Sequence, residues 1–179
     1  MHTLARGPIY FGPLPERPPQ NRFDAPAGEF RTLYAAERLE GAFVETVLRR
    51  PTGRILRRSF VEERGWSVVR PLRPLRLAKL FDEGLQFHQI DAGEISSDDY
   101  RPSRALAAAL HHEFVDLDGL AYRSRYNNGE VCYALFDRVA AADLSADPVD
   151  RFADFPDRVD ELMELHGAVF DTSPAVPDL

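Results

Sequence analysis

Apolar and polar positions alternate in short blocks along the chain, and these blocks predict a mixture of strands and helices. Residues 31–36, RTLYAA, predict a short strand. Residues 37–50 predict a helix with cationic residues in its last turn and Pro51 just beyond it. The chain is therefore expected to pass from a strand directly into a helix.

The middle of the chain has the pattern of a sheet. Residues 53–80 contain the runs RILRRSFV, WSVVRP and LRLAKLF, and their β-branched and alternating character predicts strands. The prolines at 71 and 74 place part of this region at a sheet edge. After this region, Ser103 is expected to cap an alanine-rich helix that runs through Phe114.

The last third predicts a hairpin and a final helix. Residues 119–126 lead into an Asn-Asn-Gly turn at 127–129, and EVCYALFDRV has the composition of a buried strand. Residues 157–166 form an amphipathic pattern with Gly167 as its stop. With no internal repeat or heptad series, the chain is expected to adopt a mixed α+β fold with mostly antiparallel sheet.

Two segments show neither the hydrophobic repeat of a helix nor that of a strand. Residues 7–29 contain six prolines and three glycines, which predicts an extended, wrapping segment rather than a helix or a central strand. The tail at 171–179 is expected to be loose. A chain of 179 residues suits one core, so residues 1–179 are expected to form a single domain.

Composition narrows the class of protein. Hydrophobic residues make up 44% and charged residues 28%, which is ordinary for a globular protein. No apolar run approaches the roughly 20 residues of a membrane span, and the N-terminus has no apolar core of signal-peptide type. A lone cysteine, Cys132, cannot form an intrachain disulfide. These features predict a cytoplasmic protein that does not enter the membrane.

The charge is unevenly distributed. The net charge of -7 argues against direct binding of nucleic acid, which requires an excess of cations. Residues 49–79 hold ten of the 22 basic residues, whereas residues 139–179 hold ten acids and two arginines. Two interpretations stay open: oppositely charged solvated faces, or an anion site or acidic partner near the basic segment.

Several familiar catalytic motifs are missing. The sequence contains no G-x-G-x-x-G, no P-loop and no G-x-S-x-G elbow, and Cys132 falls within an apparent buried strand where a thiol is usually inert. His111 and His112 are adjacent, so on a helix they point in different directions, and no metal site is predicted. The cluster at 96–99, SSDD, is interpreted as a loop or helix start.

One carboxylate has an unusual setting. Glu45 lies inside LEGAFVETVL, a predicted helix with apolar residues on nearly every side, between Ala42 and Leu48 and one turn after Gly41. A carboxylate that is shielded from water is costly unless it has a purpose. A salt-bridged helix residue is the alternative to a working carboxylate.

Four further candidates surround this helix in the sequence. Tyr34 ends the strand that feeds the helix, and a core aromatic is its alternative role. Arg22 and Arg31 bracket the turn-rich DAPAGEF segment, where an arginine can grip a phosphate or carboxylate, although most loop arginines lie on the surface. Ser124 lies between two arginines just before the predicted hairpin, and a solvated turn would look similar.

Two long blocks of the sequence resemble the RES domain family, which is named for its arginine, glutamate and serine. NRFDAPAGEFRTLYAAERLEGAFVETV resembles the family's N-terminal block, in which an arginine-containing turn leads into L-Y-x-A and a helix ending A-x-x-E. Arg22, Tyr34 and Glu45 fall on those positions. DGLAYRSRYNNGEVCYALFDR resembles the second block, with its serine at Ser124.

The resemblance runs from about residue 3 to about residue 138 and is poor in the middle. It begins at LAR, which places Arg6 on the family's early arginine, and it departs from many relatives at Phe23, where they carry Trp. The resemblance implies an ADP-ribosyltransferase-like fold with a mostly antiparallel split sheet and flanking helices. It also implies a bacterial toxin that consumes NAD as a substrate, holds no permanently bound cofactor and pairs with an Xre-like antitoxin carrying a helix-turn-helix domain.

The resemblance also implies roles for the candidates. Glu45 would stabilise the oxocarbenium-like transition state that forms when the nicotinamide-ribose bond breaks. Arg22 would be the leading clamp for the pyrophosphate, and Tyr34 would pack beside nicotinamide. The full set expected to bind NAD comprises Arg6, Arg22, Arg31, Tyr34, Ser124 and Arg125.

Alternatives remain at this point. The same site could transfer ADP-ribose to a cellular protein, and the sequence does not separate this from transfer to water or phosphate. A different class is a non-catalytic module that docks an acidic partner on residues 49–79. An antitoxin would have to block the site, for instance by inserting a chain end. The oligomeric state is left open, with a homo-oligomer among the alternatives.

Overall fold

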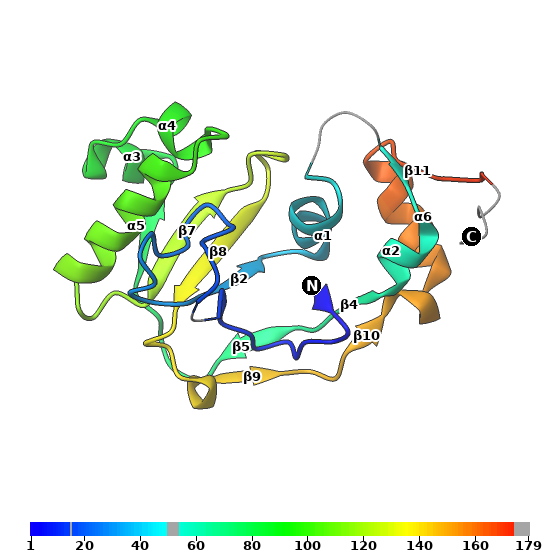
Figure 1. Ribbon diagram of the computed structural model, residues 1–179, viewed down its shortest axis with the longest axis horizontal. Coiled ribbons are helices and arrows are strands. Elements are labelled where there is room, and N and C mark those ends of the chain that lie inside the picture. Colours follow the sequence, from blue (N-terminus) through cyan, green and yellow to red (C-terminus); the bar gives the residue numbers. More distant parts are fainter. Residues whose placement is uncertain (15, 50–53, 174–179) are drawn as a thin grey trace.

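The computed structural model describes residues 1–14, 16–49 and 54–173, and it shows an α+β fold in which helices flank mixed sheets (Figure 1). The helices are α1 (Leu39–Val47), α2 (Arg58–Glu62), α3 (Glu83–His88), α4 (Ala92–Ser96), α5 (Arg101–Glu113) and α6 (Pro156–Leu165). The strands are β1 (His2–Thr3), β2 (Thr32–Ala36), β3 (Ile55–Leu56), β4 (Arg64–Trp66), β5 (Val69–Pro71), β6 (Leu77–Leu80), β7 (Gly119–Arg123), β8 (Val131–Phe136), β9 (Leu144–Ala146), β10 (Asp150–Arg151) and β11 (Val169–Phe170).

A four-stranded sheet in the order β2-β8-β7-β6 forms the centre of the molecule. Strand β8 pairs antiparallel with both β2 and β7, whereas β6 pairs parallel with β7. The register places Ala36 opposite Cys132, and Cys132 opposite Tyr122. Because directly opposed residues lie on the same face, these three side chains form one row across the sheet.

Each face of this sheet is covered by a different part of the chain. Buried residues of α5, including Ala107 and Leu110, pack on the face that carries Tyr122 and Cys132, and Figure 1 shows α3, α4 and α5 gathered on this side. The opposite face carries Leu33 and packs against the segment around β9. Burial of apolar side chains on both faces holds the sheet rigid between two layers.

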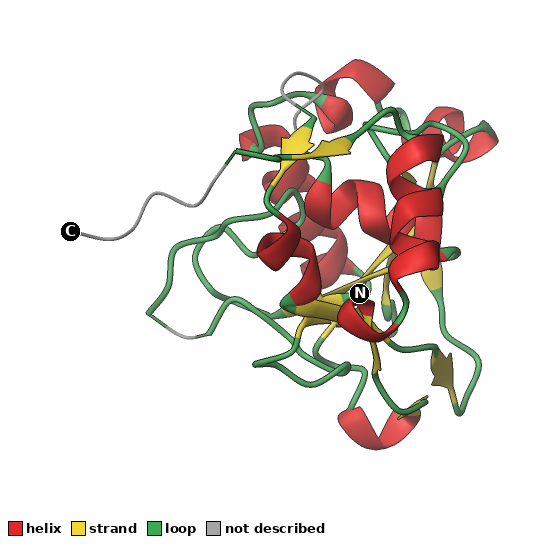
Figure 2. Cartoon of the chain, turned by 90° about the vertical axis from the view of Figure 1, so that its right-hand side faces the viewer, coloured by secondary structure: helices red, strands yellow, loops and turns green. Residues whose placement is uncertain are grey.

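A second core lies at the other end of the molecule. It joins the buried face of α1 to α2, α6 and the β4 region, and it includes Phe43, Val61, Phe152 and Leu162. Figure 2 looks onto this end, where the short parallel pair of β3 and β11 lies near α6. Helix α1 therefore lies between the two cores, with one side packed into the second core and the other turned toward the central sheet.

The predicted passage from strand to helix is confirmed, but the predicted end of the helix is wrong. Helix α1 ends at Val47, and Leu48 leaves the helical region of backbone angles while its side chain stays in the second core. Arg49 follows the helix instead of lying in its last turn, and its Nε donates a hydrogen bond to the carbonyl of Glu45 at 2.6 Å. Pro51 lies outside the described residues.

The middle of the chain contains a helix where strands were expected. At the end of RILRRSFV and just beyond it, residues 58–62 form α2, because Val61 is fully buried in the second core and Arg58 pairs with Glu62 across one turn. The short helices α3 and α4 were likewise absent from the sequence prediction. Gly53 lies outside the described residues.

Helix α5 matches its prediction except at its cap. The N-cap is Tyr100, and Ser103 lies in the first turn with its side chain buried. Its hydroxyl donates to the carbonyl of Arg22 at 2.8 Å or of Tyr100 at 3.1 Å. Ser103 was therefore wrongly assigned as a cap, because its hydroxyl holds the N-terminal segment onto the helix.

The hairpin, the last helix and the proline-rich segment follow the sequence prediction. Strands β7 and β8 form the hairpin, and α6 ends before Gly167, whose φ of +61° suits a helix stop. Pro15 lies outside the described residues. The rest of the segment 7–29 contains no helix and passes over the sheet as an extended segment (Figure 1). In the tail, residues 174–179 lie outside the described residues.

Part of the basic segment is paired with nearby acids. Arg70 pairs with Asp147 and Arg73 with Asp143, which joins this segment to the acidic C-terminal part along the antiparallel pair of β5 and β9. These contacts favour the interpretation of charged solvated faces over a docking surface for an acidic partner. None of the described helices is long and apolar enough to span a bilayer.

Candidate functional site

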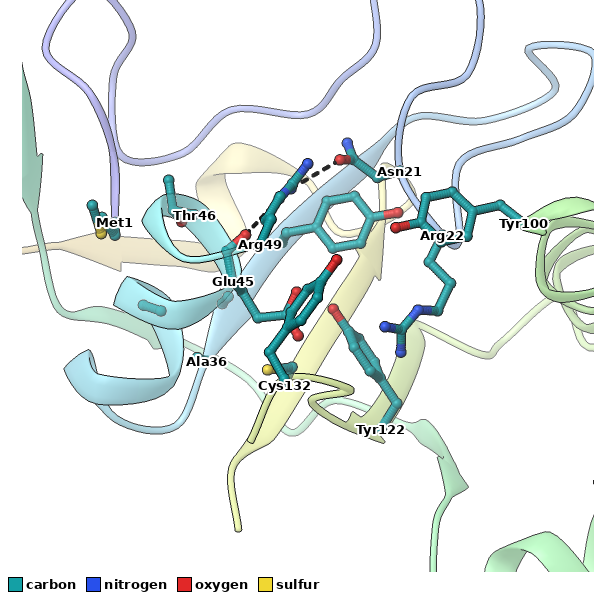
Figure 3. A pocket seen from close by; sticks show the side chains of 14 residues that line it. Met1, Asn21, Arg22, Ala36, Glu45, Thr46, Arg49, Tyr100, Tyr122 and Cys132 are labelled. Atoms are coloured by element: carbon teal, nitrogen blue, oxygen red, sulfur yellow. Dashed lines mark hydrogen bonds between the residues drawn. The ribbon is translucent and has the colours of Figure 1, made fainter. Parts of the chain in front are cut away.

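A pocket of about 640 Å³ lies between α1 and the end of the central sheet (Figure 3). Its walls come from the proline-rich segment, β2, α1, the start of α5 and the β7–β8 hairpin. The lining residues are Met1, Asn21, Arg22, Tyr34, Ala35, Ala36, Ala42, Glu45, Thr46, Arg49, Tyr100, Tyr122, Tyr126 and Cys132.

Arg22 reaches this pocket from the proline-rich segment. The residue is only 6% exposed, and Figure 3 shows its guanidinium group turned toward the ring of Tyr122. The guanidinium carbon lies 5.4 Å from the centre of that ring. Its buried Nε has no hydrogen-bond partner among the described residues. A buried arginine held in this way is prepared for an anion or a polar ligand.

Tyr34 and Asp24 fix the backbone that carries Arg22. The Tyr34 hydroxyl donates to Asp24 Oδ1 at 2.9 Å and accepts a hydrogen bond from the backbone N–H of Phe23 at 3.0 Å. Asp24 is fully buried, and its other oxygen accepts the N–H groups of Gln20 and Asn21. Burial, with the negative charge of Asp24, raises the pKa of Tyr34 well above its usual value. Tyr34 is therefore a neutral hydrogen-bond donor that holds this loop.

Glu45 enters the pocket from α1. Its side chain is half-buried, and its Oε1 is buried without a hydrogen-bond partner in the described part of the chain. On the helix, Ala42 precedes it by three positions and also lines the pocket, so the wall before the carboxylate is small and apolar. Figure 3 shows Glu45 and Arg22 on facing sides of the pocket.

Arg22 and Glu45 thus line the same cavity, and neither side chain forms an ion pair with the other or with another described residue. Among the described residues, no ion pair within 4.0 Å involves either side chain. Native proteins pair nearly all their buried polar groups, so each exception calls for an explanation, and two exceptions of opposite charge in one pocket make it a candidate ligand site. The two unpaired groups are the chemical centre of this pocket.

Aromatic rings and a thiol form the rest of the wall. Tyr100, Tyr122 and Tyr126 join Tyr34 in the lining. Burial raises the pKa of Tyr122 well above its usual value and that of the Cys132 thiol to about 12. Tyr122 and Cys132 therefore stay neutral at physiological pH and contribute polarisable surface rather than charge.

An ion pair between the buried Glu130 and the exposed Arg38 holds the hairpin against α1. Glu130 is 2% exposed, and its two carboxylate oxygens accept hydrogen bonds from the guanidinium of Arg38, which directly precedes the helix. The Glu130 side chain lies against Gly41, where an added Cβ would come within 2.9 Å of Oε2. Glycine at this position therefore allows α1 to approach the hairpin and brings Glu45 over the sheet. Neither Arg38 nor Glu130 was singled out from the sequence.

Two of the sequence candidates support the pocket from behind. Ser124 is fully buried, and its hydroxyl accepts the N–H groups of Tyr126 and Asn127 at 3.2 Å, which shapes the turn that presents Tyr126. Arg125 donates to the carbonyl of Ser97 and pairs with Asp98. Neither Ser124 nor Arg125 lines the pocket.

The other two candidates, Arg31 and Arg6, do not line this pocket either. Arg31 is exposed at the start of β2, pairs with Asp137, and borders a separate depression near Pro26. Arg6 is exposed and stacks on Tyr10, with its guanidinium carbon 4.6 Å from the ring centre. It lines a second hollow that adjoins the pocket. The structure therefore brings together Arg22, Tyr34 and Glu45 and places Arg31 elsewhere.

Some lining residues were not identified from the sequence although a signal was present. Tyr122 lies in β7, two positions before Ser124, and Arg49 lies four positions after Glu45 in the sequence. Asn21 directly precedes Arg22, and its side-chain oxygen accepts a hydrogen bond from Arg49 at 3.1 Å. A search two positions from Ser124 along a strand, and four positions from Glu45 along a helix, would have found Tyr122 and Arg49.

The pocket can hold a polar ligand with a flat, cationic or aromatic group. A carboxylate, a guanidinium and several tyrosine rings surround one space, which suits stabilisation of positive charge beside an anion clamp. Within the described residues, no group of three or more His, Cys, Asp and Glu side chains is placed to hold a metal ion.

Comparisons with known proteins agree with this architecture. The RES domain family model matches residues 2–156, which include every lining residue of the pocket except Met1. The fold is similar to a chain in the crystal structure of the M. tuberculosis MbcT-MbcA toxin-antitoxin complex, with a TM-score of 0.60 over 80% of this chain and 76% of that chain. At 15% identity this likeness concerns the fold alone. No curated protein matches the sequence significantly.

Proposed function

The chain belongs to the RES domain family, and from that premise we propose that it cleaves NAD at the bond between nicotinamide and ribose. The observation that carries this proposal is the pair of buried, unpartnered groups, Glu45 Oε1 and Arg22 Nε, that face one tyrosine-lined pocket. An ADP-ribosyltransferase-like arrangement of the sheet and α1 is part of the same proposal.

Glu45 stabilises the charge that develops during cleavage. When the bond between the ribose C1′ and the nicotinamide nitrogen breaks, nicotinamide leaves with the bonding electron pair and becomes neutral, while the ribosyl carbon takes on oxocarbenium character. A carboxylate that is not engaged by an internal cation can face this centre at full charge. An acceptor then attacks C1′ and loses its proton to Glu45 or to water.

The remaining lining residues bind and orient the substrate. The tyrosine rings suit the cationic nicotinamide ring of NAD, because aromatic faces attract cations. Arg22, held by the loop that Tyr34 and Asp24 fix, donates to an oxygen of the nucleotide near the reacting ribose. Ser124 acts indirectly in this scheme, by shaping the turn that carries Tyr126.

The decisive test is release of nicotinamide from NAD by the purified protein, followed by chromatography, with Glu45→Gln beside wild type. Glutamine keeps the size of the side chain and removes its charge, and we expect release to fall by a factor of about 1,000. The unfolding midpoint of each variant serves as the folding control. Equal release from both proteins would remove Glu45 from the mechanism, and no release by wild type would refute NAD cleavage.

The acceptor of ADP-ribose is identified by varying what is added to the same reaction. With water or phosphate as acceptor, purified protein and NAD suffice, and the product is ADP-ribose or its phosphate. If wild type consumes NAD only after a protein extract is added, the reaction is ADP-ribosylation of a protein. Among the described residues that line the pocket, Glu45 is not joined by a second carboxylate, which favours a small acceptor that approaches from solvent.

A protein that consumes NAD would harm its own cell unless its activity were inhibited. We propose that the protein is the toxin of a toxin-antitoxin pair and that an Xre-like antitoxin blocks the pocket. The family membership and the likeness in fold to a chain of a toxin-antitoxin complex support this assignment. Expression in a bacterial host should arrest growth and deplete NAD, and Glu45→Gln should do neither. Growth arrest that persists with Glu45→Gln would favour a binding module over an enzyme.

A further inference from the structure

A second hollow of about 980 Å³ adjoins the pocket that holds Glu45. The two cavities share part of one wall, to which Asn21, Tyr34, Thr46 and Arg49 contribute. A ligand that fills the first pocket and is long enough to leave it would therefore enter the second hollow beside Arg49. None of the family motifs quoted for this chain assigns a role to Arg49.

The second hollow is cationic in an acidic protein. Arg6, Arg17 and Arg49 line it, and among the residues that the structure describes no aspartate or glutamate does. The chain as a whole carries a net charge of -7. For these three arginines, no ion pair within 4.0 Å is found with a described carboxylate, whereas Arg31, Arg70 and Arg73 are all paired. A concave surface of one charge attracts ligands of the opposite charge.

Arg49 is positioned by neutral partners. Its Nε donates to the carbonyl of Glu45 at 2.6 Å, and one terminal nitrogen donates to Asn21 Oδ1 at 3.1 Å (Figure 3). These bonds fix the direction of the guanidinium and leave its charge uncompensated. The other terminal nitrogen makes no hydrogen bond within the described part of the chain and is available to a ligand.

Arg6 and Tyr10 complete the far side. The Arg6 guanidinium carbon lies 4.6 Å from the centre of the Tyr10 ring. The ring also packs closely on Gly12, where an added Cβ would come within 2.6 Å of the ring carbon Cε1. Glycine at 12 thus gives the tyrosine its place, and the tyrosine gives Arg6 a flat support.

We propose that the second hollow binds the diphosphate of the dinucleotide, with Arg49 as its principal contact and Arg6 and Arg17 as outer contacts. This inference rests on the proposed function, because it takes NAD as the ligand of the first pocket. It moves the diphosphate away from Arg22, which the sequence suggested as the main clamp. Arg22 then acts beside the nicotinamide ribose, and Arg49 determines how tightly the rest of the molecule is held.

Adenosine diphosphate is the probe, because it carries the diphosphate and lacks nicotinamide. Its binding is measured by calorimetry on full-length wild type, Arg49→Gln and Arg6→Gln. The control is Arg151→Gln, because Arg151 is exposed and lines neither cavity. We expect the Kd to rise by a factor of about 10 or more for Arg49→Gln, less for Arg6→Gln, and not at all for the control. Equal binding by wild type and Arg49→Gln, or no binding by folded wild type, overturns the proposal.

Turnover separates this inference from the proposed function. In nicotinamide release, Arg49→Gln should raise KM for NAD by about the same factor and leave kcat within a factor of about three. A lower kcat at unchanged KM overturns the diphosphate role. If wild type releases no nicotinamide yet binds adenosine diphosphate through Arg49, NAD cleavage fails and the anion site stands. If it cleaves NAD and Arg49→Gln changes neither KM nor Kd, the anion site fails alone.

Discussion

Buried charged groups lie near both ends of strand β7, but within the described part of the chain they are paired at one end and unpaired at the other. Just before its first residue, Asp118 is buried and accepts two hydrogen bonds from the Arg73 guanidinium, at 2.7 and 2.9 Å, and one from the N–H of Arg76. Near the other end, beside Tyr122, Arg22 and Glu45 expose buried atoms without partners to one pocket.

This difference separates charge that serves the fold from charge that serves a ligand. A buried carboxylate with a complete set of donors is stable only as part of its network, and removing one partner is costly. A buried group without partners lowers stability, so its presence requires another explanation. Mutations at the two ends of β7 should therefore divide into those that change stability and those that change activity.

After Glu45, the largest effect is expected at Arg22. Arg22→Gln should lower kcat/KM for nicotinamide release by a factor of about 100 to 1,000, because it removes a buried donor from the transition state. The free energy of unfolding should stay equal or rise, since an uncompensated buried cation is lost. A large drop in stability with unchanged turnover of the folded fraction would reverse the assignment.

Asp118 should show the opposite pattern. Asp118→Asn should lower the free energy of unfolding by about 2 kcal/mol, because the charge-assisted bonds to Arg73 are weakened. Chemical denaturation measures this, and nicotinamide release per folded molecule should be unchanged.

The same pair predicts a dependence on pH. Hydrogen bonds from Arg73 lower the pKa of Asp118 in the folded protein. Its contribution to stability is therefore complete above the unfolded pKa of about 4 and is lost as pH falls through the lower folded value. Wild type should lose stability relative to Asp118→Asn across this acid range, and parallel curves would contradict the pairing.

Tyr34 connects stability to activity. Tyr34→Phe removes the hydroxyl that bonds to Asp24 and Phe23, so we expect a loss of about 1.5 kcal/mol in the free energy of unfolding. Because the same bonds hold the loop of Arg22, nicotinamide release should fall by a factor of about 10. Unchanged activity in the destabilised variant would show that Arg22 is held by other contacts.

Ser124 should give the smallest effect. Ser124→Ala removes the acceptor for the N–H groups of Tyr126 and Asn127 and should cost about 1 kcal/mol of stability. Since Ser124 does not line the pocket, release per folded molecule should stay within a factor of about three of wild type. A loss of 100-fold would indicate direct contact with NAD.

Much of this architecture was predictable, because it is encoded locally. Helix α1, strand β2 and the hairpin follow from hydrophobic periodicity and turn residues, and the family motifs identified Arg22, Tyr34 and Glu45. Helix α2 was missed because burial of Val61 in a distant core overrides its weak local pattern.

The contacts of the site depend on pairings far apart in the sequence, which local patterns do not reveal. The bond between Glu130 and Arg38 joins residues 92 positions apart, and that between Ser103 and the Arg22 carbonyl joins residues 81 positions apart. The second hollow likewise forms only when the N-terminal segment lies beside α1. The spacing from Glu45 could have drawn attention to Arg49, but its place on the wall shared by the two cavities is visible only in the folded chain.

The most direct test measures nicotinamide release per folded molecule and the free energy of unfolding for Glu45→Gln and Asp118→Asn together. The account predicts that Glu45→Gln loses a factor of about 1,000 in release and no stability, whereas Asp118→Asn loses about 2 kcal/mol of stability and no release. Equal losses of activity in the two variants, or full release by Glu45→Gln, would contradict it.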